Sequence, residues 1–114
     1  MKKEKEYHQK LIRDNIPEII EANNGESETR TLSEIDFEKE LRKKLIEEAI
    51  EVANAPSDKL LDELADMLEL IKSIASNYKI DYLDIEKRQI EKRRERGTFA
   101  KRLFLIWSTR KPSK

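Results

Sequence analysis

Five acidic residues near the middle of the sequence have the types and the spacing of a metal-binding site. They are Glu47, Glu48, Glu51, Glu63 and Asp66. Positions three apart in a helix share a face, so the pattern E-E-x-x-E and the later E-x-x-D each pair two carboxylates. If the two helices pack antiparallel around a turn at Pro56, four carboxylates converge. A hard divalent cation would remove their mutual repulsion, and oxygen-rich sites suit Mg²⁺ or Mn²⁺.

Two of these glutamates fall inside the apolar stripes of their predicted helices. Glu48 projects beside Leu41 on the first helix, and Glu63 projects beside Leu70 on the second. Glutamate is almost never buried unless it is paired or coordinated. Because 42% of the residues are charged, either spacing alone is expected by chance on an exposed helix face. Both spacings on consecutive helices, each with one member in the stripe, favour a functional site.

The elements that must position these side chains are four helices, of which the second and third are long and central. The expected ranges are 17–23, 34–55, 58–78 and 81–96. Ser33 is expected to cap the second helix and Ser57 the third, with Pro56 ending the second. Gly97 stands where a helix-ending glycine belongs. The sequence therefore predicts an all-α, four-helix bundle-like fold.

Two segments outside the helices favour extended structure. Residues 26–32 contain β-branched residues in alternation, and residues 103–107 form the apolar run Leu-Phe-Leu-Ile-Trp. Either residues 28–32 pair with residues 103–107 as a short strand pair, or the apolar run covers the open end of the bundle.

Length and composition restrict the class of protein. The 114 residues predict a single domain, 1–114, with disordered ends at 1–6 and 110–114. The chain has no cysteine, which excludes disulfides, thiolate zinc sites and thiol catalysis. There is no signal-peptide pattern and no apolar run of membrane-spanning length, so we expect a cytoplasmic protein without a membrane partner.

Charge and apolar content point to partners of a particular kind. Basic and acidic residues balance at 24 each, which gives no indication of a specific nucleic-acid partner. Apolar residues make up only 37% of the chain, yet they lie in long stripes. This combination is typical of helices that share a core with another subunit, and it predicts a homodimer or a larger homo-oligomer.

The acidic clusters and their flanks resemble a known superfamily. Residues 44–51 (Lys-Leu-Ile-Glu-Glu-Ala-Ile-Glu) and 62–66 (Asp-Glu-Leu-Ala-Asp) resemble the signature of the all-α nucleoside triphosphate pyrophosphohydrolases. That superfamily includes the MazG proteins, the dimeric dUTPases and the phosphoribosyl-ATP pyrophosphohydrolases. Residues 10–17, 29–32 and 96–99 resemble segments of a single-domain, phosphoribosyl-ATP pyrophosphohydrolase-like subgroup. The resemblance extends from residue 7 to about residue 105.

The resemblance implies a reaction and a role for each site residue. The expected activity is Mg²⁺-dependent cleavage of a canonical or non-standard nucleoside triphosphate to the monophosphate and pyrophosphate, in nucleotide housecleaning. Glu48, Glu51, Glu63 and Asp66 are expected to hold the ion, and Glu47 and Glu48 are the candidate catalytic residues. The candidates for binding substrate phosphate or shaping the pocket are Lys92, Arg93, Arg96, Arg13 and Asp14.

The sequence is also compatible with other functions. Asn15 stands where relatives often have lysine, and Thr98 where a second glycine is common, so the substrate preference is not fixed. One alternative is the phosphoribosyl-ATP pyrophosphohydrolase of histidine biosynthesis. Another is a non-catalytic helical interaction module of the same fold, which would have no need of buried glutamates. A nucleic-acid binder that uses the basic fourth helix is a weaker third alternative.

Overall fold

The computed structural model describes residues 4–112 and contains four α-helices in this range. They are α1 (Ile16–Ala22), α2 (Glu34–Asn54), α3 (Ser57–Asn77) and α4 (Tyr82–Arg96). The all-α class predicted from the sequence is confirmed, and the predicted helix ranges agree with the observed bounds to within one or two residues. The outermost residues of the two ends expected to be disordered, 1–3 and 113–114, lie outside the described residues.

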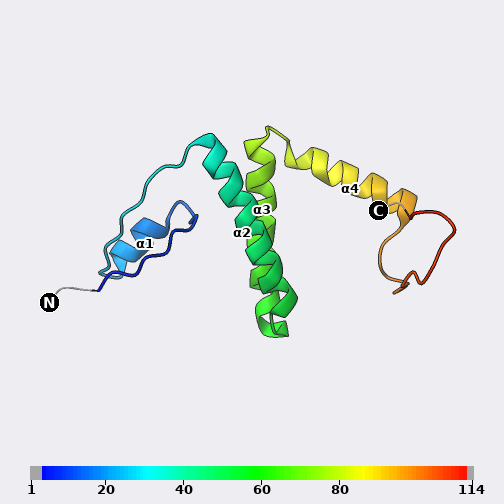
Figure 1. Cartoon of the computed structure of the whole chain (residues 1–114), viewed down its shortest axis with the longest axis horizontal. Helices are drawn as coiled ribbons and strands as arrows, with labels where there is room; N and C mark the ends of the chain where they lie inside the picture. The colour runs from blue at the N-terminus through cyan, green and yellow to red at the C-terminus, as the bar shows by residue number, and fades with distance from the viewer. Residues whose placement is uncertain (1–3, 113–114) are drawn as a thin grey trace.

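The centre of the molecule is an antiparallel hairpin of the two longest helices, α2 and α3 (Figure 1). The Ser33 hydroxyl accepts a hydrogen bond from the Asp36 N–H at 3.2 Å, which caps α2 as the sequence predicts. The predicted cap at Ser57 is wrong, because Ser57 is already the first residue of α3. Pro56 takes the capping position with extended backbone, and its carbonyl accepts a hydrogen bond from the Lys59 N–H.

Helix α4 leaves the hairpin at the end of α3. The Asp81 carboxylate accepts a hydrogen bond from the Leu83 N–H at 3.0 Å and so caps the helix start. Gly97, with a φ of 83°, ends the helix, as its position in the sequence predicts. From there α4 runs away from the hairpin, while α1 and the N-terminal segment lie on the opposite side (Figure 1).

The short strand pair considered from the sequence is not formed. Residues 4–112 contain no β-strand, and residues 28–32 and 103–107 are irregular. They lie on opposite sides of the hairpin (Figure 1), so they do not pair with one another. The apolar run at 103–107 does not cover the hairpin either, because all five of its side chains are exposed.

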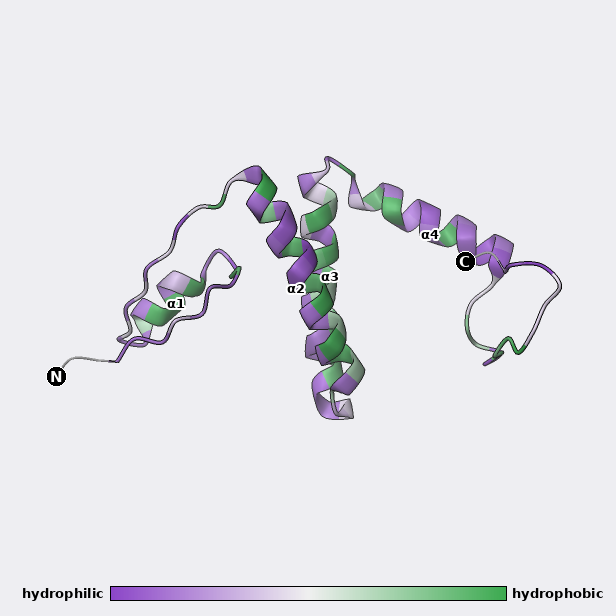
Figure 2. Cartoon of the chain, viewed as in Figure 1, coloured by the Kyte–Doolittle hydropathy of each residue, from purple (hydrophilic) through white to green (hydrophobic). Residues whose placement is uncertain are grey.

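The apolar core within one chain is small. Among the described residues, only Leu41, Leu70 and Ala75 are buried, and all three lie in the hairpin. The radius of gyration is 19.2 Å, against about 13 Å for a compact domain of similar length. The single chain is therefore open, and α1 and α4 do not close a four-helix bundle around α2 and α3. Apolar residues remain visible along both hairpin helices (Figure 2).

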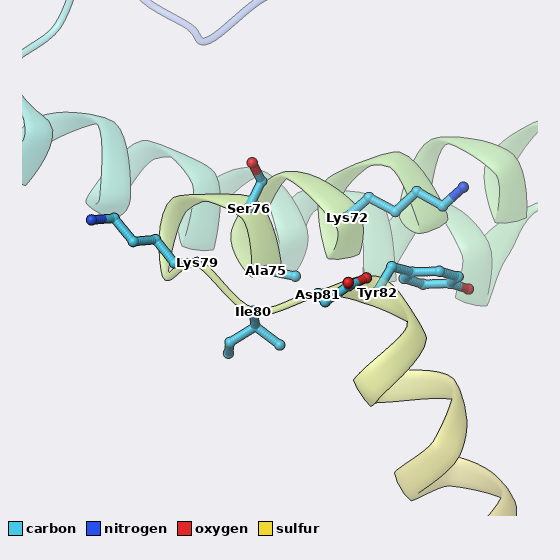
Figure 3. Close-up of a pocket in the computed structure, with 7 residues that line it drawn as sticks. All are labelled: Lys72, Ala75, Ser76, Lys79, Ile80, Asp81 and Tyr82. Carbon is cyan, nitrogen blue, oxygen red and sulfur yellow. The ribbon is translucent and has the colours of Figure 1, made fainter.

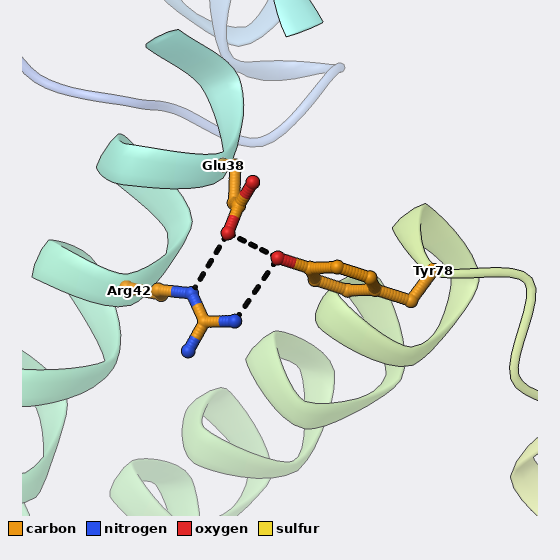
Figure 4. Close-up of polar contacts among 3 residues, drawn as sticks. All are labelled: Glu38, Arg42 and Tyr78. Atoms are coloured by element: carbon orange, nitrogen blue, oxygen red, sulfur yellow. Dashed lines mark hydrogen bonds and ion pairs between the residues drawn. The ribbon is translucent and has the colours of Figure 1, made fainter. Parts of the chain in front are cut away.

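A polar network joins the start of α2 to the end of α3 (Figure 4). Arg42 donates hydrogen bonds to the Glu38 carboxylate at 3.2 Å and to the Tyr78 hydroxyl at 3.0 Å. The Tyr78 hydroxyl donates to Glu38, and this bond, more than the nearby Arg42, keeps the pKa of Glu38 below its usual range. The network fixes the open end of the hairpin, opposite the Pro56 turn.

No helix within residues 4–112 combines the length and the apolar character that a membrane span requires.

Candidate metal centre

Three of the predicted carboxylates lie together between the hairpin helices. Glu48 comes from α2, and Glu63 and Asp66 come from α3, three residues apart on one helix face. Each offers one oxygen, and these oxygens all lie within 4.8 Å of one another. The short turn at Pro56 returns the chain antiparallel, which places the second half of α2 beside the first half of α3 (Figure 1).

Glu48 is the most constrained member of the cluster. Its Oε1 atom is buried and has no hydrogen-bond partner among the described residues. A buried, unpartnered carboxylate oxygen is costly, and such groups in native proteins generally bind an ion, a water or a proton. The burial of this oxygen without a partner distinguishes the cluster from an ordinary group of acidic surface residues.

The surroundings of Glu48 raise its pKa from 4.5 to about 7. The largest cause is the neighbouring Glu63 carboxyl, which shares a hydrogen bond with Glu48 when one of the two carries a proton. Burial of Glu48 and the negative charges of Glu63, Asp66 and Glu51 raise the pKa further. Below pH 7 Glu48 is therefore mostly protonated, and a cation that binds there would have to displace the proton.

Asp66 has a cationic partner from a distant part of the chain. Arg13, in the N-terminal segment before α1, donates from Nη2 to Asp66 Oδ1 at 2.7 Å. Both side chains are about half exposed. The pair spans 53 positions of sequence, and no periodicity in the sequence indicates it.

The residues present fit a hard divalent cation. All three donors are carboxylates, which suit Mg²⁺ and Mn²⁺, and they leave coordination positions for water or phosphate. Oxygens that share a Mg²⁺ ion at 2.0–2.1 Å lie at most about 4.2 Å apart. The three oxygens lie within 4.8 Å of one another, an upper bound slightly beyond that limit, so the side chains would have to move closer together wherever a separation exceeds about 4.2 Å.

Two predicted members of the acidic site lie outside this group. Glu51 and Glu47 are exposed on α2 and do not join the three converging oxygens, although the charge of Glu51 contributes to the raised pKa of Glu48. Glu47 instead borders a cavity of about 200 Å³ between α2 and residues 8–11. The helical spacing predicts a shared face for Glu48 and Glu51. Glu51, however, lies about one turn closer to Pro56 along α2, and its side chain is exposed.

The basic residues predicted to bind phosphate are not brought to the acidic group within the chain. Lys92, Arg93 and Arg96 are exposed on the second half of α4, which points away from the hairpin (Figure 1). Asp14 is also exposed, and of the predicted basic residues only Arg13 contacts the acidic cluster.

A second cavity, which the sequence does not predict, lies at the corner between α3 and α4. It has a volume of about 510 Å³, and Lys72, Ala75, Ser76, Lys79, Ile80, Asp81 and Tyr82 line it (Figure 3). The Lys72 ammonium lies 4.9 Å from the centre of the Tyr82 ring, and the Lys72 and Lys79 side chains extend in opposite directions (Figure 3). The lysines do not converge on a common point, and we assign no chemistry to this cavity.

Comparison of the chain with protein-family models, with curated proteins and with solved structures gives no match.

Proposed function

We propose that the protein is a Mg²⁺-dependent nucleoside triphosphate pyrophosphohydrolase, which cleaves a canonical or non-standard nucleotide to a monophosphate and pyrophosphate. The observation that carries this proposal is the convergence of Glu48, Glu63 and Asp66 around the buried, unpartnered Oε1 atom of Glu48. The resemblance of residues 44–51 and 62–66 to the all-α pyrophosphohydrolase signature supplies the reaction class.

The acidic residues have separate roles in the proposed reaction. Glu48, Glu63 and Asp66 hold the divalent ion, with Glu51 nearby as a further acidic group. When bound, such an ion neutralises negative charge on the triphosphate oxygens. We assign to Glu47, which is exposed one residue before Glu48, the role of orienting a water molecule. The water oxygen forms a bond to the α-phosphorus and the water releases a proton to solvent, while the bond from the α-phosphorus to the bridging oxygen breaks and pyrophosphate leaves.

Cations that face the phosphates come from outside the hairpin. Arg13 is already at the cluster, and its guanidinium fits phosphate oxygens. Lys92, Arg93 and Arg96 lie in the second half of α4, a helix that runs away from the hairpin holding the acidic group (Figure 1). We therefore assign their phosphate contacts to the site of a neighbouring subunit.

A second copy of the chain also accounts for the exposed apolar surface. On α2, Ile46 and Ile50 lie one turn apart, and on α3 the residues Leu61, Leu64 and Leu68 repeat at helical spacing. Their exposed fractions range from 39% to 78%. Apolar stripes of this extent are typical of helices packed against another subunit. The proposed enzyme is thus a homodimer or a larger homo-oligomer built on the hairpin.

Pyrophosphate release across a panel of nucleotides tests the proposal. The panel should contain canonical and damaged nucleoside triphosphates and phosphoribosyl-ATP, each with Mg²⁺ and with EDTA. We expect release with Mg²⁺ and none with EDTA, and the preferred substrate separates housecleaning from histidine biosynthesis. The matched variant is Glu63→Gln, which keeps the shape of the side chain and removes one ligand charge.

The separation of α4 from the acidic cluster favours one alternative, a non-catalytic interaction module that uses the basic helix and the apolar faces. Such a module has no requirement for a divalent ion. Calorimetric titration with Mg²⁺ distinguishes the two functions, because the enzyme binds the ion through its three carboxylates and the module does not.

A further inference from the structure

The Arg13–Asp66 pair places a fixed positive charge at the edge of the acidic cluster. Among the described residues, Asp66 is the member of the cluster that accepts a hydrogen bond from a basic side chain, at 2.7 Å from Arg13 Nη2. Glu48 and Glu63 face one another instead. Three carboxylates therefore share one guanidinium, which leaves the cluster short of positive charge.

A divalent ion and this guanidinium would compete for the same aspartate. An ion bound about 2 Å from Asp66 Oδ1 would lie at most about 5 Å from Arg13 Nη2. The divalent ion and the Arg13 guanidinium would repel one another at this distance. The Arg13–Asp66 pair is about half exposed, so the arginine side chain has room to move away. Arg13 is half exposed and belongs to an irregular segment before α1, so its side chain is free to change rotamer without disturbing a packed core.

We propose that Arg13 is a built-in competitor of the divalent ion, paired with Asp66 when the site is empty and displaced from it when an ion binds. This inference rests on the proposed function, because it requires Asp66 to be a ligand. The displaced guanidinium remains beside the ion, where the phosphates of a nucleotide would lie. Arg13 thus lowers ion affinity in the absence of nucleotide and raises nucleotide affinity once the ion is bound.

The opposite role is equally concrete and makes the opposite prediction. If Arg13 stayed bonded to Asp66 and oriented it toward the ion, it would be a positioning residue of the metal site. Loss of such a partner typically weakens metal binding about 10- to 100-fold. Loss of Arg13 should therefore strengthen binding of the divalent ion if Arg13 is a competitor, and weaken it if Arg13 is a positioning residue.

The test is calorimetric titration of the full chain with Mn²⁺, without nucleotide, for the natural protein and for Arg13→Gln. We expect the variant to bind Mn²⁺ about 1.4- to 5-fold more tightly, which corresponds to the roughly 0.2–1 kcal/mol of an exposed ion pair. The matched control is Arg30→Gln, which removes the same charge from an exposed position in the irregular connection between α1 and α2 and should leave the affinity unchanged. High salt should reduce the difference between Arg13→Gln and the natural protein.

Each outcome has a definite meaning. Unchanged or weaker binding by Arg13→Gln would overturn the inference while leaving the metal site intact. An equal gain in Arg30→Gln would reduce the effect to general charge and would also overturn it. Absence of Mn²⁺ binding by the natural protein would overturn the proposed function, and the inference with it.

A spectroscopic readout covers the case in which Arg13→Gln folds poorly. In the natural protein, the Nε–Hε resonance of Arg13 should shift as Mg²⁺ is added, in step with the resonances of Asp66. Arg13→Lys, which keeps the charge and loses the planar fork, should bind Mn²⁺ with an affinity between those of the natural protein and Arg13→Gln. An Arg13 resonance that does not respond to saturating Mg²⁺ would contradict displacement.

Discussion

At the scale of single residues, two features of the surroundings of Glu48 disfavour its charged form. Its Oε1 atom is buried without a partner, which disfavours a charge, and two further carboxylates converge on it. A proton offsets both features in the metal-free protein, as the raised pKa of Glu48 indicates. A divalent ion at the proposed metal site would also offset them, by neutralising the same carboxylates.

Glu48→Gln and Glu63→Gln should each abolish Mg²⁺-dependent hydrolysis. Loss of a direct ligand should cost more than the roughly 10- to 100-fold typical of outer-shell partners, so we expect a reduction of at least about 100-fold. Circular dichroism should show unchanged helix content, since the amide keeps the carboxylate's shape. Glu69→Gln, an exposed position on α3, is the control and should retain activity. Full activity in both ligand variants would contradict the site assignment.

The raised pKa of Glu48 predicts how stability depends on pH without metal. Between pH 4.5 and about pH 7, the folded protein holds a proton on Glu48 that the unfolded chain has released. Its contribution to the free energy of unfolding is therefore fully present below pH 4.5 and is lost as pH rises through 7. Urea denaturation at several pH values in EDTA measures this trend, which Glu48→Gln should flatten and Glu69→Gln should not. Identical pH profiles for Glu48→Gln and the natural protein would contradict the prediction.

At the scale of elements, the α2–α3 hairpin brings the three carboxylates of the site together. The capping at Ser33, the stop at Pro56 and the glycine at 97 follow from local chemistry, which is why the sequence predicts the helices closely. The convergence of Glu48, Glu63 and Asp66 follows from spacing plus an antiparallel turn. The identity of the residue at the start of α3 was less predictable, because both Pro56 and Ser57 favour helix starts.

Contacts between distant segments could not be read from the sequence. The Arg13–Asp66 pair and the Glu38–Arg42–Tyr78 network depend on how the segments lie in space, not on any periodicity. Residues 103–107 have strand-like composition but no strand to pair with, so local propensity alone gave the wrong expectation there.

Leu41 should be the residue on which the hairpin depends most among its apolar side chains. It is 3% exposed, and Leu41→Ala should lower the free energy of unfolding by about 2–5 kcal/mol. Ile35→Ala, at a residue of the same helix that is 70% exposed, should change it by less than about 0.5 kcal/mol. Urea denaturation followed by circular dichroism compares the two. Equal losses in the two variants would show that the hairpin packing differs from the one described.

At the scale of the whole molecule, one chain is too open to be the complete functional unit that we propose. Its basic α4 points away from its acidic cluster, and its hairpin exposes apolar stripes (Figures 1 and 2). A second copy would cover the stripes and could bring α4 to the neighbouring site. The oligomer and the complete phosphate-binding site are thus parts of one proposal.

Sedimentation velocity should show a dimer or a larger oligomer at micromolar concentration. Leu61, 78% exposed on α3, lies in the proposed contact, and Leu61→Glu should shift the protein toward the monomer because it buries a charge there. Lys59→Glu, exposed on the same helix, should leave the oligomer intact. A natural protein that sediments as a monomer across the concentration range would contradict the shared core.

In the proposed reaction, water attacks the α-phosphorus at a carboxylate-held divalent ion, and hydrolysis in ¹⁸O-labelled water shows which product receives the water oxygen. With Mg²⁺ and the preferred nucleoside triphosphate from the panel, ³¹P NMR and mass spectrometry should find pyrophosphate without label and a nucleoside monophosphate carrying one ¹⁸O. EDTA and Glu63→Gln should each prevent both products. Orthophosphate and a nucleoside diphosphate as products, label in the pyrophosphate, or undiminished turnover in EDTA would contradict the account.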